Sequence, residues 1–152
     1  MVINTKDFGF VNIDEGDIIS FPDGLYGFEG EKRFALLKNP DNGVVFHLQS
    51  VENQNPRLIL VDPYLFFADY NPVFPEGVTE KLFCGKNGKL NFFVVAVLPP
   101  RIKDTTVNLK SPVVINFEKK VGGQIILENK DYTVRERLFR KAAPKNRREA
   151  VV

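Results

Sequence analysis

Apolar residues along this chain gather in short runs that are separated by turn-forming residues. From Phe46 to Gln49 apolar and polar side chains alternate, which is typical of a strand with one buried face. Residues 89–98 form a longer apolar run that stops at Pro99 and predicts a central strand. The same criteria predict short strands at residues 8–13, 18–21, 33–37, 44–51, 57–61, 89–98, 106–109, 113–117, 124–127 and 132–138.

Turn-forming residues stand between these predicted strands. Asn42-Gly43 and Asn87-Gly88 predict tight hairpin turns. Gly122-Gly123 predicts the turn that leads into the strand at 124–127. Pro112 has no backbone N–H to donate to a neighbouring strand, so it predicts a sheet edge or a bulge.

Two segments fit a strand pattern poorly. Residues 76–83 predict a short helix, because Pro75 stands near their start and proline is favoured at the first helical position. Residues 64–70 fit either a strand or a loop that carries aromatic side chains. Many short strands with at most one or two short helices predict an all-β, mainly antiparallel fold, either a small barrel or a sandwich.

The length and composition of the chain favour a single β domain. A chain of 152 residues is expected to form one domain with a core of its own. Its 14 phenylalanines, together with many valines and isoleucines, suit the half-buried surface of a sheet. We assign this domain to residues 1–140. Residues 141–152 lack a core pattern, and we expect them to form a basic, flexible C-terminal tail.

The net charge of +2 conceals an uneven distribution of charge. Residues 135–148 are rich in lysine and arginine and contain one acid, Glu136, so the rest of the chain is acidic. A basic tail on an acidic body predicts two faces with different partners, or simply a solvated end. A small β-barrel that binds nucleic acid through this tail is the alternative function. Only Phe139 stands among the basic residues, which argues against direct nucleic-acid binding.

The sequence indicates a cytoplasmic protein. Cys84 is the single cysteine, so no disulfide can form within the chain, as expected in a reducing compartment. The first ten residues lack a basic segment followed by an apolar run, so we expect no signal peptide. No apolar run approaches the ~20 residues that span a bilayer, so we expect no membrane partner.

The residues that most often carry catalysis do not occur at spacings typical of catalytic or metal-binding motifs. We therefore predict no catalytic residue, metal or cofactor. His47 is the only histidine, and its alternation with Phe46 and Leu48 predicts that it lies on the exposed face of a strand. Cys84 has no CxxC partner. The glycines at 24, 27 and 30 do not match a phosphate-binding loop.

Three segments in order resemble the FliW family of flagellar assembly factors. "ISFPDGLYGFEGEKRFALL", from Ile19, is similar to the family's F-x-x-G-L-x-G-F-E…F…L segment. "FHLQSVENQNPRLILVDPYLFFADY", from Phe46, is similar to its L-Q-S…P…DP…Y segment. "TVNLKSPVVIN", followed by Gln124, is similar to its T-x-N-L-x-[AS]-P-[IV]-x-[IV]-N…Q segment. The similarity extends over residues 3–138.

The resemblance implies a small β-barrel-like, non-enzymatic protein of the bacterial cytoplasm that is monomeric when free. It implies that the chain binds flagellin before export and also binds CsrA, a small RNA-binding protein that represses flagellin translation. The two partners would compete, so that free protein captures CsrA when secretion drains flagellin. If CsrA binding weakens RNA affinity, RNA must weaken CsrA binding equally.

The residues that would contact partners are predicted from their chemistry. Exposed aromatic side chains often anchor protein interfaces, and the segment before Pro72 and Pro75 is rich in them. The loop after Pro99-Pro100 adds charged and polar groups, although Asn108 and Pro112 could instead shape a bulge. The predicted partner-binding residues are Tyr64, Phe67, Asp69, Tyr70, Arg101, Asp104, Thr105 and Asn108.

Overall fold

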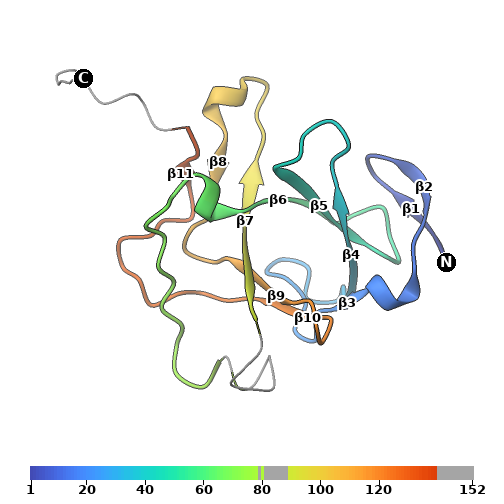
Figure 1. Ribbon diagram of the computed structural model, residues 1–152, viewed down its shortest axis with the longest axis horizontal. Helices are drawn as coiled ribbons and strands as arrows, with labels where there is room; N and C mark the ends of the chain where they lie inside the picture. The colour runs from blue at the N-terminus through green and yellow to red at the C-terminus, as the bar shows by residue number, and fades with distance from the viewer. Residues whose placement is uncertain (79, 81–88, 140–152) are drawn as a thin grey trace.

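The fold consists almost entirely of short strands (Figure 1). The computed structural model describes residues 1–78, 80 and 89–139. The strands are β1 (Val2–Thr5), β2 (Gly9–Asn12), β3 (Ile19–Ser20), β4 (Arg33–Lys38), β5 (Val45–Ser50), β6 (Arg57–Val61), β7 (Asn91–Val97), β8 (Thr106–Val107), β9 (Val113–Asn116), β10 (Val121–Gln124) and β11 (Glu136–Arg137). The 3-10 helices are η1 (Glu15–Asp17), η2 (Pro63–Leu65) and η3 (Ile102–Asp104).

Seven of the strands close into a barrel. They follow the order β7-β6-β5-β4-β3-β10-β9, and β9 pairs back onto β7, as the ring of ribbons in Figure 1 shows. The pair β3–β10 is parallel and the other neighbours are antiparallel, so the barrel is mixed. The predicted all-β, mainly antiparallel barrel is therefore confirmed.

The interior of the barrel is filled by side chains from β3 to β7, from β9 and from the turn after β3. Successive residues of a strand face opposite sides, so Leu48 points into the barrel whereas its neighbours point outward. Aromatic pairs brace the interior, with ring centroids 5.2 Å apart for Phe21 and Phe34 and 5.5 Å apart for Phe46 and Phe93. The buried members are Ile19, Phe21, Leu25, Phe34, Leu48, Leu60, Phe93, Val113 and Ile115.

β8 and β9 both pair with the same edge of β7, and the pairing along that edge is interrupted between them. At the break the backbone N–H of Asn108 donates to the carbonyl of Val95. The side-chain oxygen of Asn108 accepts from the backbone N–H of Ser111 at 2.9 Å. Pro112 lies just before β9, and its carbonyl accepts from Ile125. Asn108 and Pro112 thus shape a kink between two strands, as the proline suggested.

The predicted turn at Gly122-Gly123 is wrong, because both glycines lie within β10. The chain turns earlier, through residues 117–120, where Lys120 has a positive φ of 55°. Glycine is needed in the strand for a different reason. A Cβ atom on Gly122 would lie 2.7 Å from Cζ of Phe21, so the barrel wall approaches the core ring more closely than alanine allows.

Two further layers cover the outside of the barrel. The β1–β2 hairpin packs on β4 and β5 through Ile3, Ala35 and Val51. Residues 62–74 and the chain beyond β8 cover the outer face of β6 and β7. The sequence pattern missed β1. In the predicted strand at 124–127 only Gln124 lies in a strand, and in the predicted strand at 132–138 only the two residues of β11 do.

Some predictions fall on residues that the structure does not describe. These are the glycine-containing turn at 87–88, half of the helix predicted at 76–83 (residues 79 and 81–83), Cys84 and the basic tail at 141–152. Among the described residues, no helix has the length and apolar character needed to cross a membrane.

Replacing Gly122 with alanine is expected to destabilise the barrel by about 1–3 kcal/mol, because the new methyl group overpacks against Phe21. Urea unfolding followed by circular dichroism measures the change. Gly43→Ala is the matched control, since nothing lies within 4 Å of the added atom there. Equal stability of the two variants would contradict this account of Gly122.

Candidate protein-binding surface

The predicted aromatic loop forms a compact turn rather than a strand. Asp62 caps η2, with its side-chain oxygen accepting from the backbone N–H of Tyr64 at 2.9 Å. Pro63 occupies the start of the helix, where its missing N–H and fixed φ are favourable. This local chemistry resolves the ambiguity between strand and loop in residues 64–70.

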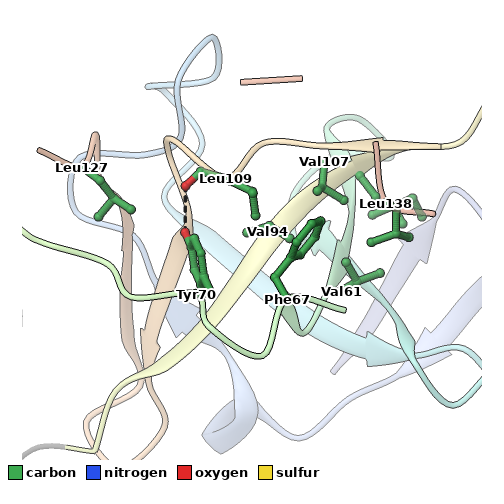
Figure 2. Close-up of a cluster of buried hydrophobic side chains, with 10 residues drawn as sticks. Val61, Phe67, Tyr70, Val94, Val107, Leu109, Leu127 and Leu138 are labelled. Atoms are coloured by element: carbon green, nitrogen blue, oxygen red, sulfur yellow. Dashed lines mark hydrogen bonds between the residues drawn. The ribbon is translucent and has the colours of Figure 1, made fainter. Parts of the chain in front are cut away.

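Phe67 and Tyr70 were predicted as exposed contacts, and this part of the prediction is wrong. Only 3% of Phe67 and 4% of Tyr70 is exposed, and Figure 2 shows both rings inside an apolar cluster. The Tyr70 hydroxyl donates to the carbonyl of Leu109 at 2.8 Å. The physical reason is that the outer face of the sheet is apolar and must be covered. That face is formed by Ile59, Val61, Val94 and Ala96.

Tyr64 remains at the surface, with 44% of the residue exposed, and joins a row of aromatic rings. Its ring centroid lies 5.7 Å from that of Tyr70 and 6.3 Å from that of Phe92. Phe74 extends the row beyond Phe92 at 5.6 Å, and Tyr132 extends it beyond Tyr70 at 4.9 Å. We call these five residues the aromatic strip. Four of the five rings are at least partly exposed, and Tyr70 is buried beneath them. Partly exposed aromatic rings are characteristic anchors of protein interfaces.

Hydrogen bonds between residues 71–73 and residues 129–132, which lie far apart in the sequence, hold the strip in place. The backbone N–H of Asn71 donates to the Tyr132 hydroxyl at 2.7 Å. The Asn129 side chain accepts from the backbone N–H of Val73 at 2.8 Å and donates to the carbonyl of Asn71 at 3.0 Å. A surface that is ordered before binding loses less entropy on association.

Two tyrosine hydroxyls of the strip, those of Tyr70 and Tyr132, take part in hydrogen bonds. Burial, with smaller effects from Tyr132 and Tyr64, raises the pKa of Tyr70. Burial also raises the pKa of Tyr64, with a further contribution from the negative charge of Asp62. Both hydroxyls therefore stay protonated at neutral pH.

Carboxylates border the strip at its Tyr132 end. A hollow of about 160 Å³ lies between Tyr70 and Tyr132 and is lined also by Asp69, Asp131 and Glu136. Of the predicted contacts in this loop, Asp69 is thus accessible and adjacent to the aromatic rings. Among the described residues, no three His, Cys, Asp or Glu side chains are arranged to hold a metal ion. The charge at this end favours a partner with a basic surface.

The second predicted loop, around η3, is only partly available. Arg101 and Asp104 lie at the surface, with their charged groups 3.7 Å apart, and Asp104 also lies 3.4 Å from Arg137. Thr105 is fully buried, which contradicts its prediction as a contact. Its hydroxyl donates to the carbonyl of Ile102 and so closes the helical turn.

The sequence pattern missed a polar cluster around His47. We expected this side chain to be exposed, but 5% of the residue is accessible because the turn of the β1–β2 hairpin covers it. Asn39 turns its amide nitrogen toward Nε2 of His47, while its oxygen accepts from the backbone of Asp41 and Asn42. The histidine therefore holds its proton on Nδ1, which lies 2.9 Å from Oδ2 of Asp7.

Asp7 ties the hairpin to the barrel. Its carboxylate lies 2.7 Å from Nε of Arg57 and accepts from Nη2 of the same side chain at 3.2 Å. Burial alone would raise the pKa of Asp7, but hydrogen bonds from His47 and Arg57 outweigh it and lower the pKa. Both nitrogens of His47 are engaged, so this cluster is a structural tie and offers no free base.

Asp7→Asn is expected to destabilise the protein by about 1–3 kcal/mol at pH 7, because the guanidinium of Arg57 loses its carboxylate. Because the pKa of Asp7 is lower in the folded state than in the unfolded state, the ionised carboxylate stabilises the fold. This stabilisation is fully present above the unfolded-state pKa of about 3.9 and is lost as the pH falls through the folded-state pKa. Urea unfolding between pH 3 and pH 7 should show a smaller pH dependence in the variant.

Asp17→Asn serves as the control for this experiment, because Asp17 is largely exposed and lies 4.0 Å from Lys120. Its effect should be within about 0.5 kcal/mol at either pH. A variant at Asp7 that kept the full pH dependence of the wild type would contradict the role assigned to this carboxylate.

Comparison with known proteins identifies the family. The sequence pattern of the family described as "FliW protein" matches residues 2–138. A flagellar assembly factor FliW from Alkaliphilus metalliredigens is 37% identical over 133 residues, covering 87% of this chain and 82% of its own. One from Leptospira interrogans is 38% identical over 144 residues, covering 93% of this chain and 95% of its own.

The fold gives the same result. A crystal structure of the flagellar assembly factor FliW superimposes with a TM-score of 0.86 at 33% identity, covering 94% of this chain and all of the other. The closed mixed β-barrel, shared with that crystal structure, places the chain among small β-barrel proteins. It belongs to the FliW family of flagellar assembly factors, which are not enzymes.

Proposed function

We propose that this chain binds flagellin in the bacterial cytoplasm and, when free of flagellin, binds and antagonises CsrA. Membership of the FliW family carries this proposal. The aromatic strip with carboxylates at one end supports it, because such a surface suits protein partners, and basic ones in particular. In this proposal the protein is a monomer until a partner binds.

Competition between the two partners makes the protein a switch. Flagellin bound before export would occupy the protein, and secretion would release it to capture CsrA. The coupling works in both directions. If this protein lowers the affinity of CsrA for RNA by some factor, bound RNA must lower the affinity of CsrA for this protein by the same factor. The level of unexported flagellin would thereby set the translation of new flagellin.

We assign the partner contacts to the accessible part of the aromatic strip and its neighbours. Tyr64 and Tyr132 supply partly exposed rings, and Asp69 supplies charge beside them. Phe67, Tyr70 and Thr105 contribute through the packing beneath the surface, because they are buried.

Calorimetric titration of the purified chain with flagellin, and separately with CsrA, from the same organism tests the function. We expect binding to both partners, and we expect flagellin to displace CsrA. We expect no association with single-stranded RNA added alone. Binding to neither protein at concentrations well above micromolar would overturn the proposal, and RNA binding would then favour the nucleic-acid alternative through the basic tail.

Tyr64→Ala is expected to weaken partner binding by about tenfold or more, because truncating an aromatic hot-spot residue costs about 2 kcal/mol or more and about 1.4 kcal/mol corresponds to tenfold. The stability of the fold should change little, since the core beneath is formed by Phe67 and Tyr70. Phe10→Ala is the matched control, because Phe10 is a more exposed ring on the separate β1–β2 hairpin. Equal affinities for the two variants would remove the strip from the interface.

A further inference from the structure

A second hollow lies beyond the Phe74 end of the aromatic strip. It has a volume of about 320 Å³ and is bounded by the turn at residues 22–30, by Pro75 and Val78, and by residues 124–126. Buried Leu25 and Ile125 line its inner side, and half-exposed Tyr26 and Ile126 stand beside them. We call this feature the Tyr26 groove.

The groove is preformed by backbone constraints rather than by long, mobile side chains. Gly24 has a φ of +67°, and a Cβ atom there would lie 2.6 Å from the backbone of Glu29, so the turn is folded tightly on itself. The backbone N–H of Tyr26 donates to the side chain of Gln124 at 3.0 Å, and Gln124 donates to the carbonyl of Ser111. These bonds connect the turn to the barrel wall.

The charged residues that line the groove are all acidic. Asp23 and Glu29 line it, and both carboxylates are exposed. Among the described residues that line the groove, none is a lysine, arginine or histidine. Aliphatic walls with a negative rim are complementary to an aliphatic side chain that stands next to a positive one.

The groove also continues the surface already described. Phe74, the last ring of the aromatic strip, packs with Val78 against buried Ile125, and both Val78 and Ile125 line the groove. A partner that lies along the strip would therefore reach the groove without crossing a separate part of the molecule.

We propose that the Tyr26 groove docks a segment of a partner protein that places an aliphatic side chain between Tyr26 and Ile126 and a lysine or arginine against Asp23 and Glu29. The inference rests on the proposed function, since it assigns a second contact to the same partner-binding surface. Hydrophobic contact supplies most of the affinity, and the carboxylates select for the basic neighbour.

Peptide selection tests the groove without assuming a partner. Phage-displayed random dodecapeptides are selected on the full-length protein after removal of those that bind Ile126→Asp. We expect enrichment of an aliphatic residue beside lysine or arginine. A synthetic enriched peptide, titrated by calorimetry, should bind Ile126→Asp and Asp23→Lys at least about tenfold more weakly than wild type. Added salt should reduce the difference in peptide affinity between wild type and Asp23→Lys, because it screens the exposed charges.

The control is Ile102→Asp, which replaces an exposed isoleucine on η3, away from the groove. Heteronuclear NMR spectra establish that each variant is folded, and Asp23→Lys, at an exposed turn position, is the variant expected to fold if Ile126→Asp does not. No enrichment, enriched peptides without a basic residue, or equal binding to wild type and a folded groove variant would overturn the proposal.

Titration of the same variants with flagellin and CsrA separates this proposal from the proposed function. We expect Asp23→Lys to weaken at least one of these partners. If wild type binds them and both groove variants bind equally well, the groove is excluded from that interface while the proposed function stands. If wild type binds neither, the proposed function fails, and the peptide selection alone decides the groove.

Discussion

The way β7 divides its hydrogen bonds is the constraint on which the rest of the structure depends. One edge of this strand pairs with β6, whereas the other pairs with β9 along its first half and with β8 at its end. The first pairing on that edge closes the barrel, and the second carries β8 and β11 away from it. Because β7 has Phe93 inside the barrel and Val94 in the outer cluster, it is buried on both faces and reads as a continuous apolar run.

The position of the candidate surface follows from that arrangement. An apolar outer face on β6 and β7 has to be covered, and residues 62–74 cover it with Phe67 and Tyr70. At the edge of this cover, Tyr64 is exposed and Tyr132 is partly buried, and both belong to the aromatic strip. In the proposed function, stability and recognition share one segment, which ties the geometry of the surface to the packing beneath it.

Contact rather than chemistry is what these side chains are suited to provide. His47 has both ring nitrogens engaged, and the raised pKa values of Tyr64 and Tyr70 keep their hydroxyls protonated. Carboxylates stand at the Tyr132 end of the strip and around the groove beyond Phe74. Electrostatic attraction of this kind speeds the encounter with a basic partner and helps to orient it, while the aromatic and aliphatic groups supply contact area.

The sequence by itself determined most strands of the barrel, though not β10, and the family. Local alternation and turn residues placed β4, β5, β6, β7 and β9 within a few residues of their observed bounds. Tertiary structure alone decided the burial of Phe67, Tyr70, His47 and Thr105, and it placed Gly122 in a strand. For three of these residues the deciding neighbour lies far away in sequence: Leu109 for Tyr70, Asp7 for His47 and Phe21 for Gly122. Periodicity reports which positions share a face, but not what later covers that face.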